Sequence, residues 1–294
     1  MMLYFGYGSN LDAVDWDAFC ARFGFGEAVL QPLNTALLLD HELVFDRYAA
    51  SRQGGALNLR ARPGQAVEGV VFRANAAALE ALDRKEGAPR AYQRVQRHAV
   101  LPDGSVSEVM TYLAPGQGHH PPHADYLHVV RRGQAAHGIA HGMMEDAARQ
   151  AEPALLIRHL FVYGTLMQGE ANAHHLAGLP RQLGRVRGRL HSCGAYPALT
   201  LGAKGEPSEV TGEVVELPLE RLAGMDALEG SLPAGAPGGM YRRSVLPVTT
   251  AAGILRAYAY IMDDAARFPP IPGGDWRHVP GRLEAWAALP PDQR

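Results

Sequence analysis

The chain has few cysteines and no long apolar run. Its two cysteines, Cys20 and Cys193, lie far apart in the 294 residues. They form no spaced cluster, so the sequence indicates neither a disulfide framework nor a zinc site. No stretch approaches the roughly 18 apolar residues of a membrane helix, and Met1–Tyr4 shows no basic segment followed by an apolar core. We therefore expect a cytoplasmic protein with no membrane partner.

An excess of charge of one sign is also lacking. The 28 basic and 30 acidic side chains leave a formal net charge of −2. No block of like charge exceeds a few residues, so nothing suggests a polyanion-binding surface, and we expect no nucleic-acid partner. The length is typical of about two domains.

A repeated pattern runs through both halves of the chain. Each half begins with a short apolar strand that ends in tyrosine, glycine and a small hydroxyl residue, at Tyr7-Gly8-Ser9-Asn10-Leu11 and at Tyr163-Gly164-Thr165-Leu166. Each half then runs to a carboxylate followed by glycine, at Glu86 and at Glu229. A long-period internal repeat of this kind usually means two copies of one domain. We place these domains at residues 1–152 and 158–294.

Apolar periodicity, with glycine and proline breaks, predicts strands and inserted helices in both halves. In the first half we expect strands at 3–7, 36–45, 56–60, 69–73, 92–101 and 107–113, and helices at 15–23, 75–85, 125–136 and 143–150. We expect Asn75 to cap the second of these helices and Gly87 to end it. In the second half we expect strands at 160–163, 185–192, 212–216, 241–249 and 255–261, and helices at 219–228 and 283–288. Strands dominate without regular alternation with helices, which favours an α+β fold with a mainly antiparallel or mixed sheet.

Both glutamates lie where ionisation is costly. Glu86 follows Leu79 and Leu82 at helical spacing, so it projects from the face that its helix buries. It also lies in the last turn before Gly87, where the negative end of the helix dipole disfavours another negative charge. Both effects raise the pKa of a carboxyl, as a general acid/base near neutral pH requires. The same argument holds for Glu229. The alternative for each is a solvated glutamate at a frayed helix end.

The Tyr-Gly turns supply a complementary property. Glycine permits close backbone approach, and successive N–H groups in a tight turn can hold an anion. Ser9 and Asn10 add side-chain donors in the first half, whereas the second half offers Thr165 and has apolar Leu166 at the position of Asn10. A turn whose glycine has only a conformational role is the alternative interpretation.

These ordered motifs resemble those of the γ-glutamylcyclotransferases, so the chain resembles a tandem γ-glutamylcyclotransferase-like (AIG2-like) domain protein. The turn Tyr7–Leu11 is similar to that of the glutathione-type and γ-glutamyl-amino-acid-type enzymes. The turn Tyr163–Met167 is similar to that of the γ-glutamylamine cyclotransferase and AIG2-like branch. The resemblance implies that each domain is a small mixed β-barrel flanked by helices, with its pocket at one end. It also implies a small-molecule γ-glutamyl substrate, no cofactor and no metal.

The resulting hypothesis is an intramolecular aminolysis that releases 5-oxoproline. Glu86 and Glu229 are the expected catalytic acid/bases, and Tyr126 resembles a family tyrosine that lines the first pocket. The expected substrate-binding residues are Tyr7, Gly8, Ser9, Asn10, Leu11, Tyr126, Tyr163, Gly164, Thr165 and Leu166. We expect the strand arginines Arg94 and Arg243 to face solvent, and pairing with a carboxylate of the substrate is the alternative. Two alternatives stay open: a related γ-glutamylamine lyase or deglutamylating enzyme, and a noncatalytic small-ligand-binding or assembly module.

Overall fold

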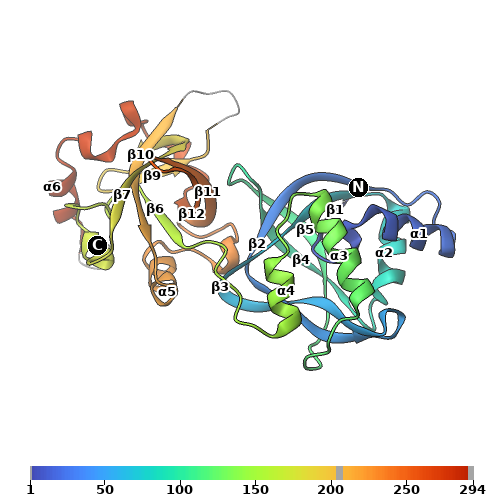
Figure 1. The fold of residues 1–294 in the computed structure, drawn as a ribbon. Helices are drawn as coiled ribbons and strands as arrows, with labels where there is room; N and C mark the ends of the chain where they lie inside the picture. Colours follow the sequence, from blue (N-terminus) through green and yellow to red (C-terminus); the bar gives the residue numbers. More distant parts are fainter. Residues whose placement is uncertain (1, 203–207, 291–294) are drawn as a thin grey trace. The chain divides into compact units, whose positions relative to one another are not determined.

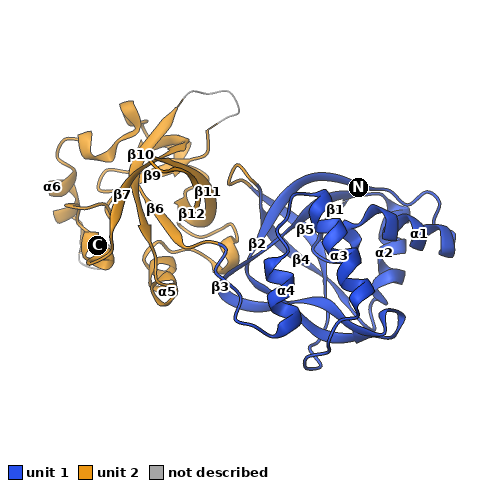
Figure 2. Cartoon of the chain, viewed as in Figure 1, with its two compact units in different colours: residues 1–101, 106–156 blue, residues 102–105, 157–294 orange. Residues whose placement is uncertain are grey.

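The structure of the protein is a computed structural model in which residues 2–202 and 208–290 are described. The chain divides into two compact units (Figure 2). Unit 1 comprises residues 1–101 and 106–156, and unit 2 comprises residues 102–105 and 157–294. Within the described ranges, no helix is long and apolar enough to cross a bilayer.

The strands of unit 1 form a closed barrel in the order β1-β3-β2-β4-β5 (Figure 1). Their bounds are β1 Met2–Gly6, β2 Leu30–Ala49, β3 Gly54–Ala74, β4 Gln93–Val100 and β5 Val106–Leu113. Strand β1 runs antiparallel to β3 and parallel to β5, with Tyr4 opposite Met110 in the parallel pair. The barrel is therefore mixed, and the strand before the first Tyr-Gly turn lies between two partners.

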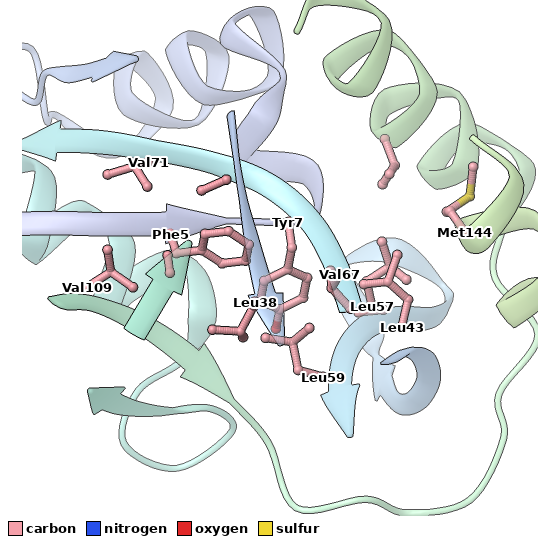
Figure 3. Packing of buried hydrophobic residues seen from close by; sticks show 14 of the residues in the cluster. Phe5, Tyr7, Leu38, Leu43, Leu57, Leu59, Val67, Val71, Val109 and Met144 are labelled. Atoms are coloured by element: carbon pink, nitrogen blue, oxygen red, sulfur yellow. The ribbon is translucent and has the colours of Figure 1, made fainter. Parts of the chain in front are cut away.

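The core of unit 1 consists of two clusters of buried side chains. Strand β1 and the turn after it contribute side chains to both clusters. Phe5 and Tyr7 pack with Leu38 and Val67 in the Phe5 cluster (Figure 3). Tyr4 lies in the other, the Tyr4 cluster. Side chains of a strand alternate between the two faces of its sheet, so one strand contributes to both clusters. Burial of side chains of this size stabilises the fold by roughly 1.5–3 kcal/mol each.

Helices cover the barrel of unit 1 by inserting apolar faces. The α-helices are α1 Ala13–Phe23, α2 Ala76–Glu86, α3 Ala124–Ala136 and α4 Gly142–Arg149, and the short 3-10 helices are η1 Ser9–Leu11 and η2 Ala50–Arg52. Tyr126 and Val130 of α3 and Met144 of α4 join the Phe5 cluster. Trp16 of α1 and Leu82 of α2 join the Tyr4 cluster. Each helix thus buries one apolar stripe, as expected for a helix on the surface of a domain.

The strands of unit 2 close into a second barrel, in the order β10-β6-β12-β11-β7. Their bounds are β6 His159–Val162, β7 Arg181–Arg187, β10 Glu209–Glu216, β11 Arg242–Thr250 and β12 Gly253–Ile261. Strand β6 runs antiparallel to β10 and parallel to β12, with Leu160 opposite Tyr258. With β6 in place of β1 and β12 in place of β5, the strand order of the two barrels is the same. The predicted α+β fold with two tandem, helix-flanked mixed barrels is confirmed.

Unit 2 carries further short elements around its barrel. Strands β8 Arg189–Ser192 and β9 Pro197–Thr200 form a two-stranded sheet. The α-helices are α5 Leu219–Leu228 and α6 Arg282–Ala287. The 3-10 helices are η3 Ala173–Leu176, η4 Pro233–Gly235, η5 Ala265–Arg267, η6 Pro272–Gly274 and η7 Trp276–His278.

Two of the predicted strand patterns differ from the structure. Residues 56–60 and 69–73 lie on one strand, β3, because β2 and β3 pair along almost their whole length, with shifts of register. Residues 185–192 belong instead to two strands, β7 and β8, which join different sheets. The extent of a strand depends on the partner that it pairs with, which a local pattern does not contain.

The cap of α2 is the one that the sequence predicts. Asn75 Oδ1 accepts hydrogen bonds from Ala78 N at 2.8 Å and Val29 N at 3.2 Å, and Asn75 Nδ2 donates to Glu27 O at 2.7 Å. The residue therefore starts the helix and also ties it to the segment before β2.

We predict that Asn75→Ala lowers the free energy of unfolding by about 1–2 kcal/mol, because the helix loses its cap and two backbone groups lose a partner. Chemical denaturation measures the change. Asn34→Ala, at an exposed position of β2, is the control and should stay within about 0.5 kcal/mol of the wild type. Equal losses in the two variants would contradict the capping role.

Candidate active sites

The turn after β1 brings Asn10 to the end of α2. Glu86 is the last residue of this helix, and Gly87 ends it in the left-handed conformation with φ 64°. Asn10 Nδ2 donates to Glu86 Oε1 at 2.7 Å and to Tyr4 Oη at 2.9 Å. The Asn10 side chain is buried, and its Oδ1 has no hydrogen-bond partner among the described residues. A buried acceptor without a partner is costly, and here it belongs to the side chain that binds Glu86.

Charged side chains surround Glu86 in the first site. Burial raises the pKa of Glu86, while the Asn10 hydrogen bond and the positive charges of Lys85 and Arg52 oppose the rise. Lys85 Nζ and Arg52 Nη2 both donate to Asp15 Oδ2, at 2.8 Å and 2.7 Å. Two cations thus share one anion, which leaves this side of the site positive.

Tyr126 of α3 lies beside the same turn. Leu57 N donates to Tyr126 Oη at 3.3 Å, and a Cβ atom at Gly8 would lie 3.5 Å from this oxygen. The Arg52 guanidinium carbon lies 5.4 Å from the centre of the Tyr126 ring. Burial raises the pKa of Tyr126 to about 12, so its hydroxyl keeps its proton near neutral pH. The fold therefore brings Tyr126, the turn and Arg52 together.

Tyr7 and Leu11 contact the core in this structure. Tyr7 Oη donates to the backbone oxygen of Tyr112 on β5 at 2.8 Å. Leu11 is 2% exposed and packs in the Tyr4 cluster. These two side chains support the turn from within the barrel and its helical cover.

The second site is a cavity of about 280 Å³ in unit 2. Its lining includes Glu229 together with Tyr163, Gly164, Thr165 and Leu166. The predicted turn and the predicted carboxylate of this half therefore meet at one cavity.

Aromatic and apolar side chains complete the wall of this cavity. Among them are Tyr196, Pro197, Met240, Tyr241, Tyr260 and Trp286. A Cβ atom at Gly164 would lie 2.5 Å from Pro197 Cγ, which explains the glycine. These wall residues are not among those that the sequence predicts for the second site, and Arg52 and Lys85 are not among those predicted for the first. Tyr196 and Tyr241 begin the short sequences Tyr196-Pro197 and Tyr241-Arg242-Arg243, but no local signal marks Trp286.

Glu229 differs from Glu86 in its electrostatic surroundings. It follows α5, its backbone N donates to Met225 O at 3.0 Å, and its side chain is half-buried. Burial raises the pKa of Glu229 to about 7, and no described neighbour offsets the effect. Leu166 stands in the turn where the first site has Asn10, so this position supplies no equivalent of the hydrogen bond that opposes the rise in the pKa of Glu86.

In each unit, a tyrosine of a barrel strand donates a hydrogen bond to an aspartate of the helix that leads to the candidate glutamate. In unit 1, Tyr112 Oη donates to Asp83 Oδ1 at 2.7 Å, and Arg94 Nε donates to the same oxygen at 2.7 Å. In unit 2, Tyr260 Oη donates to Asp226 Oδ1 at 2.8 Å. The repeat thus extends to side chains that the motifs alone do not connect.

The expectation that Arg243 faces solvent is wrong. Its side chain is 1% exposed, and its Nε lies 3.2 Å from Asp226 Oδ1. The guanidinium carbon also lies 5.0 Å from the centre of the Tyr258 ring. A carboxylate and an aromatic face together accommodate a buried guanidinium. Arg94, by contrast, keeps a side chain that is 36% exposed.

We predict that Asn10→Leu, which gives the first turn the residue found in the second, raises the pKa of Glu86. The variant removes a hydrogen bond to the ionised carboxylate, which favours the protonated form. Carbon-detected NMR titration of the glutamate carboxyl groups measures the shift. Asn34→Leu, on an exposed part of β2, is the control and should leave the titration unchanged. A pKa that stays the same or falls in Asn10→Leu would contradict the role of Asn10.

We predict that Glu229→Gln stabilises the protein at pH 8 and not at pH 4. The pKa of Glu229 is about 7 in the folded protein and 4.5 for an unperturbed group. Since the folded state binds the proton more tightly, stability falls as pH rises from about 4.5 to 7, and above 7 the full penalty is present. The variant removes this penalty, which is about 3 kcal/mol for a shift of this size. Chemical denaturation at the two pH values measures it, and Glu220→Gln at an exposed position of α5 should show no difference.

No curated protein matches the chain. A solved structure described as a gamma-glutamyl cyclotransferase is 25% identical, with a TM-score of 0.44, over 52% of this chain and 89% of its own. An AIG2-like protein from Mus musculus is 23% identical, with a TM-score of 0.35, over 43% of this chain and 93% of its own. YkqA from Bacillus subtilis is 14% identical, with a TM-score of 0.37, over 99% of this chain and 94% of its own.

One protein-family model matches the chain twice. The family described as gamma-glutamyl cyclotransferase, AIG2-like, matches residues 4–128 and residues 160–278. The first match contains the turn after β1 and Glu86, and the second contains the turn after β6 and Glu229. Together the matches span well over half of the sequence. The chain therefore belongs to the AIG2-like gamma-glutamyl cyclotransferase family and carries two copies of its domain.

Proposed function

We propose that the protein is a γ-glutamylcyclotransferase that releases 5-oxoproline from a γ-glutamyl amino acid, amine or peptide. The observation that carries the proposal is Glu229, a half-buried carboxyl with a pKa of about 7 in the wall of a cavity beside the Tyr163–Leu166 turn. A carboxyl with this pKa can accept and donate a proton near neutral pH. The cavity of about 280 Å³ is close to the lower end of small-molecule pockets, about 300 Å³.

The proposed reaction is an intramolecular aminolysis. Ionised Glu229 accepts a proton from the α-ammonium group of the substrate, and the free α-amine attacks the γ-carbonyl carbon to close a five-membered ring. The protonated carboxyl then donates the proton to the leaving nitrogen as the bond between carbon and nitrogen breaks. The ring nitrogen still carries the second proton of the attacking amine, and Glu229 passes this proton to the departing amine. The products are therefore 5-oxoproline and the amine as an ammonium ion, and Glu229 is ionised again. Because the attack is intramolecular, positioning the substrate supplies much of the rate enhancement.

In this proposal, the N–H groups of the Tyr-Gly turn bind the anionic groups of the substrate. Met167 N donates to Gly164 O at 2.9 Å, and Asn172 N donates to Thr165 O at 2.8 Å, so hydrogen bonds brace the turn on both sides. A braced turn presents its N–H groups without reorganisation when negative charge develops. We assign these N–H groups to the α-carboxylate or to the oxyanion of the tetrahedral intermediate.

Glu86 performs the same steps in the first site. Its surroundings differ, because Asn10 orients the carboxylate and Arg52 and Lys85 lie nearby. A positive side favours substrates that carry a further carboxylate. We therefore assign γ-glutamyl amino acids and peptides to the first site and γ-glutamylamines to the second.

The test is release of 5-oxoproline from γ-glutamyl amino acids, γ-glutamylamines and glutathione by the wild type, Glu86→Gln, Glu229→Gln and the double variant. Each single variant should lose about 10²–10⁴-fold on the substrates of its own site, because glutamine cannot transfer the proton. In Glu86→Gln, the remaining activity should rise with pH through about 7 as Glu229 ionises.

Two exposed glutamates on the same helices provide matched controls. Glu80→Gln on α2 and Glu220→Gln on α5 should keep wild-type release. No release from any substrate by folded wild-type protein would overturn the proposal. Binding of γ-glutamyl compounds without release would favour the noncatalytic ligand-binding alternative.

A further inference from the structure

Helix α6 brings an aromatic ring to the second site from outside the family match. The family match ends at residue 278, whereas Trp286 of α6 lines the same cavity as Glu229. The Trp286 side chain is half-buried, so part of its ring is open to a ligand. A tryptophan ring in such a position offers a large, rigid apolar contact area.

An ion pair holds α6 beside the Tyr-Gly turn. Arg282 Nε donates to Glu170 Oε1 at 3.0 Å, and Arg282 Nη2 donates to the same oxygen at 2.9 Å. The Glu170 side chain is 3% exposed, and its backbone N donates to Met167 O at 3.1 Å, at the end of the turn. Arg282 and Trp286 are four residues apart and therefore lie on one face of the helix. This face binds the turn segment and places the ring at the cavity.

The described wall of the cavity contains little charge. Glu229 is the lining residue that can be ionised near neutral pH, and the lining includes no lysine or arginine. Tyr196 and Trp286 are half-buried and Met240 is 48% exposed, so each keeps part of its surface open in the wall of the cavity. A carboxylate held between these three side chains would lose part of its hydration without gaining a cationic partner, which is costly.

We propose that Trp286 is a specificity-determining residue of the second site, which selects γ-glutamyl amides whose amine carries an aromatic or extended apolar group. The inference rests on the proposed function. The γ-glutamyl head binds at Glu229 and the turn, and the substituent of the departing amine packs between Trp286, Tyr196 and Met240. Stacking of the substituent on the indole ring adds affinity beyond the area that it buries.

The role of Trp286 can be tested without turnover in the double variant Glu86→Gln, Glu229→Gln. Calorimetry measures the binding of each probe to this variant. The probes are γ-glutamyl phenethylamide, γ-glutamyl methylamide and γ-glutamylphenylalanine. Adding Trp286→Ala should weaken phenethylamide binding by about 10-fold or more and methylamide binding by less than about 2-fold. Trp286→Phe should restore most of the affinity because it keeps a ring. γ-Glutamylphenylalanine, which adds a carboxylate to the phenethylamide, should bind the second site about 10-fold more weakly.

Further variants distinguish the contribution of the Trp286 ring to binding from that of the rest of helix α6. Leu283→Ala, at a position of α6 that is 45% exposed, is the matched control and should change nothing. Arg282→Met should weaken phenethylamide binding as Trp286→Ala does, since it releases α6 from Glu170. No change for the phenethylamide in Trp286→Ala, or equal weakening for both amides, would overturn the role of Trp286.

Turnover is measured separately, as 5-oxoproline release by the Glu86→Gln variant. Binding that depends on Trp286 without any release would overturn the cyclotransferase proposal alone. Release from both amides with the same ratio of kcat/KM before and after Trp286→Ala would overturn the specificity role alone.

Discussion

A buried tyrosine hydroxyl ties each Tyr-Gly turn to a neighbouring barrel strand. Tyr7 Oη donates to Tyr112 O at 2.8 Å in unit 1, and Tyr163 Oη donates to Tyr260 O at 2.5 Å in unit 2. Both acceptors lie on the strand that runs parallel to the one before the turn. Water does not compete for a hydrogen bond in the barrel interior, so the turn is held firmly. The position of each candidate site depends on this bond.

The two sites share this frame and differ in charge. Asn10 donates to Glu86 in the first, where Lys85 and Arg52 also oppose the rise of its pKa. In the second, burial acts on Glu229 without opposition. One repeated scaffold therefore provides two carboxyl groups in different electrostatic environments. Helix α6 adds to the difference, because its Trp286 lines the second cavity.

Much of the scaffold follows from local patterns in the sequence. The short apolar run at residues 3–7 predicts the first strand, and the cap at Asn75 and the stop at Gly87 predict α2. Such signals act over a few residues, through the alternation of side chains along a strand and the unpaired groups at helix ends. Each motif occurs once in each half of the chain, so the presence of two tandem domains of one family could also be inferred from the sequence.

By itself the sequence determined the two-domain plan, the Tyr-Gly turns and the helices that end near Glu86 and Glu229. Only the tertiary structure decided that 56–60 and 69–73 form one strand, that Arg243 is buried, and that Trp286 lines the second cavity. Each of these depends on a partner outside the local pattern: strand β2, Asp226 and Glu170. Pairing and burial are set by neighbours in space, and a local pattern does not specify those neighbours.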